Sequence, residues 1–72
     1  MADKNDGKIF KDLGNKIRKA REHVRLTQAE VAKSAGLNVS YYAQIERGEV
    51  NPSYEKLQAI AKVIKMKSLD MS

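Results

Sequence analysis

Apolar residues recur along this chain with the spacing of helices. From residue 10 they follow steps of three and four, at Phe10, Leu13, Ile17, Ala20 and Val24. Such steps place side chains on one face of a helix, so the pattern predicts a first helix over residues 8–24. Residues 1–7 are polar and have no period, and we expect them to form a flexible tail. No stretch alternates with period two, so no strand is predicted.

Capping residues predict where the next helices begin and end. Thr27 and Glu30 have the spacing of a capping box, in which each side chain bonds a free backbone N–H, and this predicts a second helix from residue 28. Gly36 is expected to end it, because Gly adopts the left-handed conformation common at helix C-termini. Asn38 then caps a third helix, and Gly48 ends that one. We expect the second helix to turn three residues inward: Val31, Ala32 and Ala35.

A fourth helix follows a loop that contains Pro52, which keeps Asn51 out of the helical conformation. Ser53 is predicted to cap this helix, and Glu55 in its first turn suits the helix dipole. Its apolar face consists of Leu57, Ile60, Ala61 and Ile64. A short fifth turn is predicted around Leu69, within residues 66–72. The expected fold is all-α and compact, with four to five helices, and residues 28–47 have the form of a helix-turn-helix.

The predicted third helix has two different faces. At about 100° per residue, Tyr42, Ile45 and Glu46 lie on one side and are expected to face the core. Val39 and Tyr41 lie at the borders. The opposite face is small and polar, and comprises Ser40, Ala43, Gln44 and Arg47. Small side chains let a helix approach base edges in the major groove, and Gln pairs bidentately with adenine. The alternative for this face is a solvated helix surface.

The charge of the chain favours a polyanionic partner. Its 72 residues, enough for one small domain over residues 8–72, carry 14 Lys and Arg against 9 Asp and Glu, a formal net charge of +5. The bases are concentrated between residues 8 and 25, where only Asp12 and Glu22 oppose them: Lys8, Lys11, Lys16, Arg18, Lys19, Arg21 and Arg25. A solvated lysine-rich surface is the alternative interpretation of the composition alone.

Several classes of function lack the residues they need. The chain has no Cys, which argues against a disulfide framework, a zinc finger and thiolate catalysis. His23 is the one His, and no Gly-rich phosphate loop or paired carboxylate accompanies it. We therefore expect no enzyme, no catalytic residue, no metal and no cofactor. With no apolar run of about 18 residues, no signal peptide and no second domain, we expect a cytoplasmic protein without membrane or small-molecule ligand.

Taken together, the motifs of residues 13–64, about three quarters of the chain, resemble the helix-turn-helix domain of phage repressor and Cro proteins, the bacterial family often called XRE. In order, the motifs are Leu13-Gly14, Ile17-Arg18 with Arg21, Leu26-Thr27-Gln28-Ala29-Glu30-Val31-Ala32, Gly36, Ile45-Glu46-Arg47-Gly48, Asn51-Pro52-Ser53, Leu57 and Ile60-Ala61. The resemblance implies a lambda-repressor-like fold.

The resemblance also implies that the chain is a transcriptional regulator that binds double-stranded DNA sequence-specifically. The type of regulator expected is a repressor. Most members bind as homodimers on near-palindromic sites, so a homodimer is expected, either in solution or only on DNA. Some small members act instead as antitoxins or as bridging or controller proteins. A protein-interaction module with secondary DNA binding is therefore the alternative function.

Base-reading positions of the family correspond to Val39, Ser40 and Gln44 of this chain. Val39 is expected either to touch a thymine methyl group or to pack at the border of the core. Gln28 corresponds to a position that contacts a phosphate and braces the recognition helix. The alternative for Gln28 is an ordinary first residue of a helix beside its cap.

Other positions of the family contact the DNA backbone or hold the fold together. Asn38 is expected to cap its helix, to contact a phosphate, or both, and Tyr41 to meet the DNA backbone. The small Ala43, on the polar face of the third helix, is expected to lie against the DNA. Arg47 and Asn51 flank the loop in which phosphate contacts are typical, although Arg47 also suits the C-terminal helix dipole. Tyr54 either packs or contacts the DNA backbone. Three residues are expected to be structural: Tyr42, and Arg21 and Glu46 as an ion pair between the first and third helices.

Overall fold

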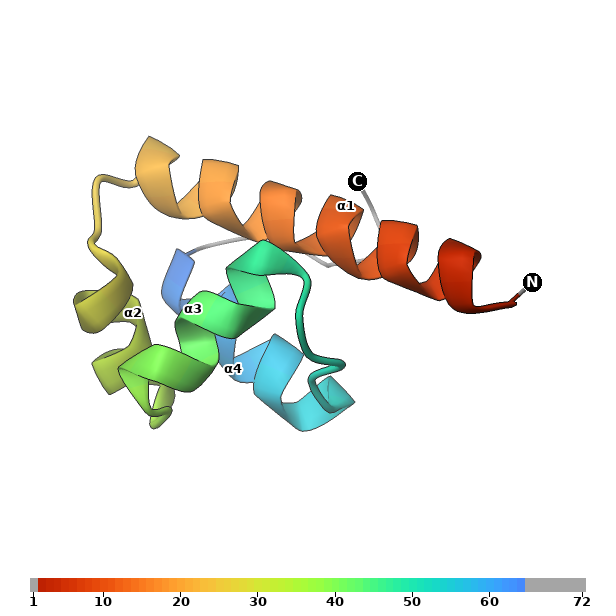
Figure 1. Cartoon of the computed structure of the whole chain (residues 1–72). Coiled ribbons are helices and arrows are strands. Elements are labelled where there is room, and N and C mark those ends of the chain that lie inside the picture. Colours follow the sequence, from red (N-terminus) through yellow and green to blue (C-terminus); the bar gives the residue numbers. More distant parts are fainter. Residues whose placement is uncertain (1, 65–72) are drawn as a thin grey trace.

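The computed structural model describes residues 2–64, which form four helices and no strand (Figure 1). They are α1 (Ala2–His23), α2 (Gln28–Ala35), α3 (Val39–Arg47) and α4 (Tyr54–Ile64). The all-α fold is as predicted, and α2 and α3 form the helix-turn-helix. The predicted fifth turn around Leu69 lies outside the described residues.

The first helix is longer than the sequence predicts. It begins at Ala2, so the prediction of a flexible tail is wrong for residues 2–7, which belong to α1. An apolar period marks only the stretch of a helix that packs on the core. Beyond that stretch a helix continues where no proline breaks it, and Ala and Lys are good helix formers.

Three of the helices begin at the predicted N-caps. The Thr27 hydroxyl accepts a hydrogen bond from the N–H of Glu30 at 3.0 Å, and the Glu30 carboxylate accepts one from the N–H of Thr27 at 2.7 Å. The Asn38 side chain accepts from the N–H two residues on, at 2.8 Å. The Ser53 hydroxyl accepts from the N–H three residues on, at 3.2 Å. The capping assignments are confirmed.

Left-handed residues end the first three helices. Gly36 and Gly48 have φ values of 74° and 75° and follow α2 and α3 directly, as predicted. Arg25, just after α1, also has a positive φ, of 63°. The sequence does not reveal this third stop, because an Arg rarely takes a conformation in which its Cβ is crowded.

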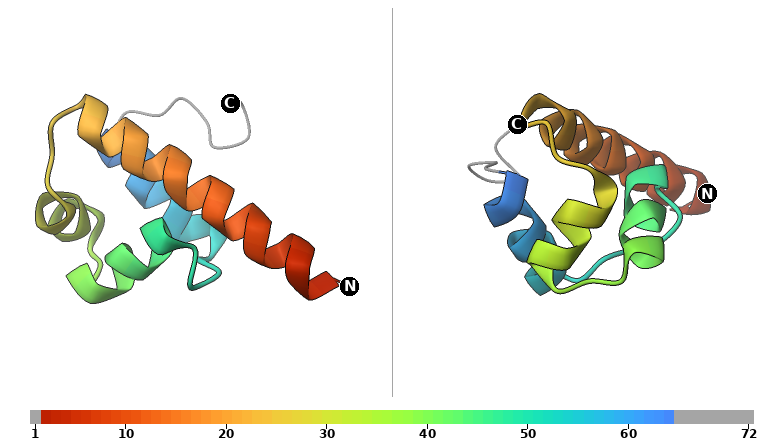
Figure 2. Two further views of the ribbon diagram at one scale, coloured as in Figure 1. Left: turned by 45° about the horizontal axis from the view of Figure 1, so that its top comes forward. Right: turned by 90° about the vertical axis from the view of Figure 1, so that its left-hand side faces the viewer.

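The core lies between the four helices and contains the predicted apolar faces. The buried hydrophobic residues that form it are Ile17, Val31, Ala32, Tyr42, Ile45, Ile60, Ala61 and Ile64. Leu13, Ala20, Val24, Ala35 and Leu57 pack against this cluster, whereas Phe10 is half-buried and outside it. α1 packs mainly on α3, and α2 on α4 and α3 (Figure 2). None of the described helices is long and apolar enough to cross a membrane.

Candidate nucleic-acid interface

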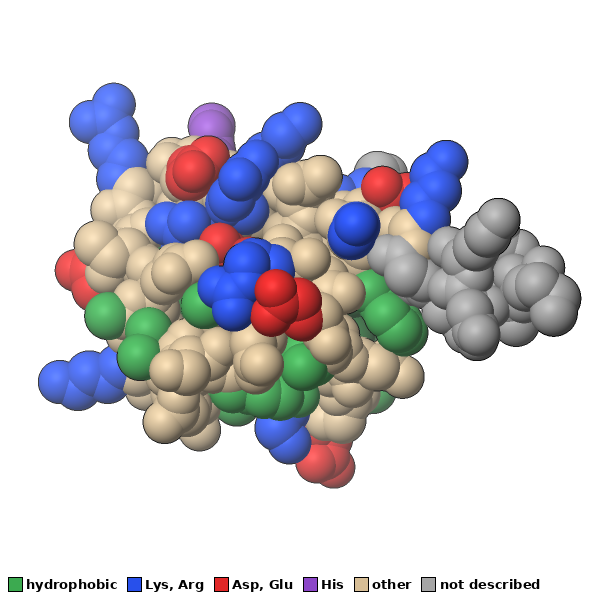
Figure 3. Space-filling model, viewed as in Figure 1, with side chains coloured by type: hydrophobic (Ala, Val, Ile, Leu, Met, Phe, Trp, Pro, Cys, Tyr) green, Lys and Arg blue, Asp and Glu red, His purple; other side chains and the backbone are tan. Residues whose placement is uncertain are grey.

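The third helix buries one face and exposes the other, as its sequence predicts. Tyr42, Ile45 and Glu46 are its buried residues. Ser40 and Arg47 are exposed, and Gln44 is half-buried. In the orientation of Figure 1, α3 lies in front of α4, and Figure 3 shows that Lys and Arg side chains are numerous above it, over α1. The free side of α3 therefore borders a basic surface.

A buried carboxylate on α3 is bonded to α1. The Glu46 carboxylate accepts hydrogen bonds from Nε of Arg21 at 2.6 Å and from its Nη2 at 3.2 Å. The side chains of Arg21 and Glu46 are only 13% and 2% exposed. Arg21 also donates through Nη1 to the carbonyl oxygen of Leu26 at 2.9 Å, in the turn before α2. The predicted ion pair between the first and third helices is confirmed.

The same carboxylate receives two more donors. The Tyr42 hydroxyl donates to Oε2 at 2.5 Å, and Nε2 of Gln28 donates to Oε1 at 2.9 Å. Burial raises the pKa of Glu46, but the hydrogen bonds from Arg21, Tyr42 and Gln28 outweigh it, so this pKa lies below its ordinary value. Burial and the bond to a carboxylate raise the pKa of Tyr42 far above its ordinary value. Glu46 thus stays ionised and joins α3 to α1 and to the start of α2.

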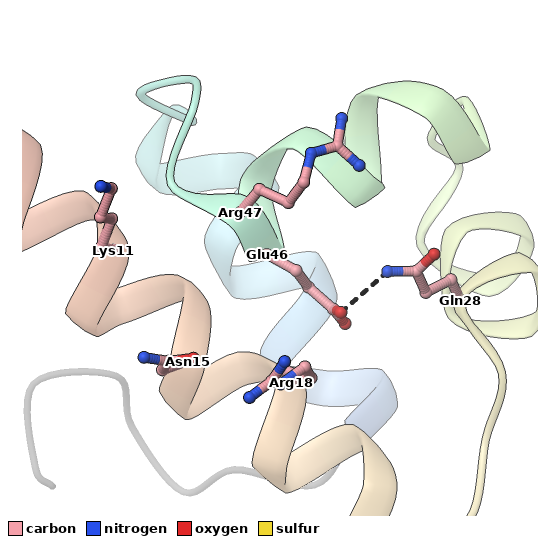
Figure 4. Close-up of a pocket in the computed structure, with 6 residues that line it drawn as sticks. All are labelled: Lys11, Asn15, Arg18, Gln28, Glu46 and Arg47. Atoms are coloured by element: carbon pink, nitrogen blue, oxygen red, sulfur yellow. Dashed lines mark hydrogen bonds between the residues drawn. The ribbon is translucent and has the colours of Figure 1, made fainter.

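A surface hollow lies beside this network. Its volume is about 380 Å³, and its lining comes from three helices: Lys11, Asn15, Arg18, Gln28, Glu46 and Arg47 (Figure 4). We call it the basic hollow, because three of these side chains are cationic. Sequence reasoning placed Gln28 and Arg47 among the contact residues but not Lys11 and Asn15. Their spacing with Arg18, at positions i, i+4 and i+7 of one helix, is the signal that could have found them.

Arg47 is held by an acidic neighbour at the rim of the hollow. Its Nε lies 2.9 Å from Oε2 of Glu49, and its Nη2 donates to Oε1 at 3.1 Å. Both side chains are about half exposed, at 56% and 49%. The hydrogen bond from Arg47 lowers the pKa of Glu49. Arg47 therefore faces solvent with its charge balanced locally.

A helix-turn-helix family model matches residues 17–71 of this chain. The chain belongs to the XRE-type helix-turn-helix family. This confirms the family inferred from the motifs of residues 13–64.

Three relatives resemble this helix-turn-helix chain. An immunity repressor protein of Bacillus phage phi105 is 43% identical over 49 residues, which cover 68% of this chain and 34% of that protein. The HTH-type transcriptional regulator DdrOP3 of Deinococcus deserti is 37% identical over 68% of this chain and 38% of its own length. The ImmF control region 10 kDa protein of phage phi105 is 38% identical over 78% of this chain and 62% of its own. The chain thus spans about a third of the first two relatives. No solved structure matches it significantly.

The predicted contact residues of this helix-turn-helix domain lie mostly at the surface. Asn38 and Asn51 are exposed, and Ala43 is half-buried on α3. Val39 is 44% exposed, so it does not pack inside the core. Tyr54 is 74% exposed, so the alternative in which its side chain packs in the fold is wrong.

Two predicted contact residues also have structural contacts. Tyr41 is half-buried against the core, and Nζ of Lys56 lies 5.9 Å from the centre of its ring, within cation–π range. Gln28 is half-buried and bonded to Glu46, so its predicted bracing of α3 is confirmed. Its predicted phosphate contact stays a prediction. Among the described residues no group of three or more His, Cys, Asp and Glu side chains could hold a metal ion.

Proposed function

We propose that this chain binds double-stranded DNA sequence-specifically and regulates transcription, with α3 inserted in the major groove. The observation that carries the proposal is the division of α3 into two faces. Glu46 anchors the inner face through three hydrogen bonds, two from Arg21 of α1 and one from Gln28 of α2. The outer face, with Ser40 and Gln44, has no large apolar residue to keep it from base edges.

Each contact residue then has a role that fits its position. Ser40 and Gln44 contact base edges, and the exposed Val39 lies against a thymine methyl group. Ala43 allows the close approach of the helix. Residues around α3 contact backbone phosphates and set its register on the duplex: Gln28, Asn38, Tyr41, Arg47 and Asn51.

The relatives support a regulatory role for this DNA binding. One is named an immunity repressor and another an HTH-type transcriptional regulator. We accordingly propose that the chain represses transcription by occluding its DNA site. We also propose that it is not an enzyme. Two-fold operators match two-fold proteins, so the bound form is proposed to be a homodimer, formed in solution or only on DNA. Access to bacterial DNA implies a cytoplasmic location.

Selection of bound duplexes from a randomised DNA pool tests the proposal. The salt is set near physiological strength, where non-specific binding is suppressed. Enrichment of an inverted repeat supports both specific binding and two-fold assembly. Enrichment of a single half-site supports specific binding by a monomer. If no sequence is enriched, the proposal is wrong, and a protein-interaction module such as an antitoxin or controller becomes the better account.

A further inference from the structure

The basic hollow lies where the middle of α1 passes the end of α3. Lys11, Asn15 and Arg18 form one stripe along α1 and face Gln28, Glu46 and Arg47 across the hollow (Figure 4). The family match begins only at residue 17, so Lys11 and Asn15 lie outside it. The hollow is thus completed by a stretch of α1 that the family match does not include.

The cations of this stripe are available to a ligand. Within residues 8–64 the ion pairs are Arg21 with Glu46 and Arg47 with Glu49, so neither Lys11 nor Arg18 has a carboxylate partner there. The one carboxylate in the lining, Glu46, already accepts hydrogen bonds from three side chains. Its negative charge is therefore largely compensated, and the hollow as a whole favours an anion.

The stripe is also held firmly against α3. A Cβ built on Gly48, the residue after α3, would lie 2.7 Å from Cα of Lys11 and 2.8 Å from its backbone nitrogen. The backbone of α1 at Lys11 is therefore in direct contact with Gly48, which ends α3. Because Arg47 belongs both to the outer face of α3 and to the hollow, the stripe adjoins the surface that faces DNA in the proposed function.

We infer that the basic hollow binds a backbone phosphate of the DNA duplex whose major groove α3 enters, with Lys11 and Arg18 as its cationic ligands. This inference rests on the proposed function and extends it to Lys11, which lies outside the family match. Ammonium and guanidinium groups make charge-assisted hydrogen bonds to phosphate oxygens, and the planar guanidinium donates two at once. Asn15 and the second amide hydrogen of Gln28 add neutral donors. The contact carries no sequence information but fixes the angle of α1 on the duplex.

Neutral substitutions of the two cations test the inference. The Lys11→Gln/Arg18→Gln variant is compared with wild type on the enriched site over a series of salt concentrations. The salt slope of the logarithm of the binding constant should fall by about 1, as for loss of one phosphate contact. At low salt the affinity should fall by about tenfold, equally on the enriched site and on random duplex. Thermal unfolding confirms that the variant is folded.

Lys16→Gln is the matched control. It removes one charge from the same helix, but position 16 lies about 140° around the helix from Lys11, and Lys16 is not part of the hollow. Its salt slope should match wild type. If Lys11→Gln and Arg18→Gln singly behave like Lys16→Gln, the inference is wrong, while the proposed function stands as long as the wild type enriches a site. If the wild type enriches no site, the proposed function itself is wrong.

A double-mutant cycle identifies the phosphate and separates it from a free anion. Single phosphates of the enriched duplex are replaced in turn by uncharged methylphosphonates. One position should weaken the wild type yet leave the Lys11→Gln/Arg18→Gln variant unaffected, which is the coupling expected of direct contact. Additive losses at every position would overturn the inference. An NMR titration with inorganic phosphate gives a second test. If phosphate shifts the Lys11 and Arg18 resonances while no methylphosphonate position couples to these residues, the inference is wrong, because the hollow then holds a free anion.

Discussion

Gly14 of α1 lies directly against the backbone of Glu46 in α3. A Cβ built on Gly14 would lie 2.3 Å from the carbonyl oxygen of Glu46 and 2.5 Å from that of Ile45. Contacts this short do not occur, so any side chain at position 14 must push the two helices apart. Since Arg21 reaches Glu46 from the same helix, this close approach sets the geometry of the whole carboxylate network.

Gly14→Ala is therefore expected to destabilise the fold. In a helix interior, replacing Gly by Ala ordinarily stabilises the folded protein by about 0.5–1 kcal/mol. Here the clash with main-chain atoms should reverse the sign and lower the free energy of unfolding by about 1–3 kcal/mol. Urea unfolding measures the change. Ser34→Ala, at an exposed position of α2, is the control for propensity alone. A stabilised Gly14→Ala protein would contradict the close approach of α1 and α3.

Glu46→Gln should be the most damaging single change in the network. It keeps the size of the side chain but leaves the charge of Arg21 without its partner in a site only 13% exposed. Breaking one side of a buried ion pair costs about 3–5 kcal/mol. The free energy of unfolding of a domain of this length is only about 4–11 kcal/mol. The variant should therefore unfold at a temperature well below that of the wild type. Glu49→Gln, which breaks an exposed pair, should leave the unfolding midpoint nearly unchanged.

Acid should act on the fold partly through Glu46. Its pKa in the folded state lies below the ordinary value of 4.5, so its ionisation adds stability that is complete above about pH 4.5. That contribution is lost as the pH falls through the lowered folded-state pKa. Between pH 7 and pH 3 the wild type should therefore lose more unfolding free energy than Glu46→Gln.

Tyr42→Phe gives a graded check of this acid dependence. It removes one of the hydrogen bonds that lower the Glu46 pKa and keeps the ion pair. The acid-induced loss of stability should then be smaller than in wild type and end at a higher pH, because it runs from the unfolded-state pKa down to the folded-state pKa. An identical pH profile for wild type, Tyr42→Phe and Glu46→Gln, measured by urea unfolding at several pH values, would show that Glu46 makes no such contribution.

The sequence predicted the parts of the fold that depend on local chemistry. The caps at Thr27, Asn38 and Ser53 and the stops at Gly36 and Gly48 need only neighbouring residues, and the structure has all of them. The helical periodicity of α3 predicted that Glu46 faces inward, because Glu46 lies on the same side of the helix as Tyr42 and Ile45. The pairing of Glu46 with Arg21 came from the resemblance, since no local pattern joins residues 25 positions apart.

Long-range geometry accounts for most of what the sequence did not predict. The apolar period of α1 stops where the core stops, so it could not show that the helix continues to Ala2. The left-handed turn at Arg25 was missed because no glycine marks it. Lys11 appeared only as one of seven bases between residues 8 and 25, and nothing in the pattern singled out Asn15. They became part of a site because the close contact of Lys11 with Gly48 brings them beside α3.

Gln44→Ala should separate base contacts from backbone contacts. Under the proposed function, Gln44 bonds a base edge from the outer face of α3, so its loss should cost about 1–3 kcal/mol of binding free energy on the enriched site. Affinity for random duplex should change little. Gln58→Ala in α4 removes the same side chain elsewhere and should affect neither DNA. Equal losses on specific and random DNA, measured by gel shift, would exclude a base contact for Gln44.

Glu49→Gln should increase the affinity for DNA. In the free protein Glu49 holds Arg47 through two hydrogen bonds, and it places a negative charge at the rim of the basic hollow. A phosphate that approaches Arg47 has to compete with this carboxylate. Exposed ion pairs are weak and screened by salt, so the gain in affinity should be modest, about two- to fivefold, and should shrink as salt rises.

Arg47→Gln is the counterpart of this test. If Arg47 contacts a phosphate, Arg47→Gln should weaken binding to specific and random DNA alike, and Glu49→Gln on that background should restore less affinity than it adds to the wild type. Titration of the four proteins with the enriched duplex at two salt concentrations measures both effects. An unchanged affinity in Glu49→Gln, together with an unchanged affinity in Arg47→Gln, would mean that the end of α3 stays clear of the DNA backbone. The contacts of the hollow would then have to come from α1 alone.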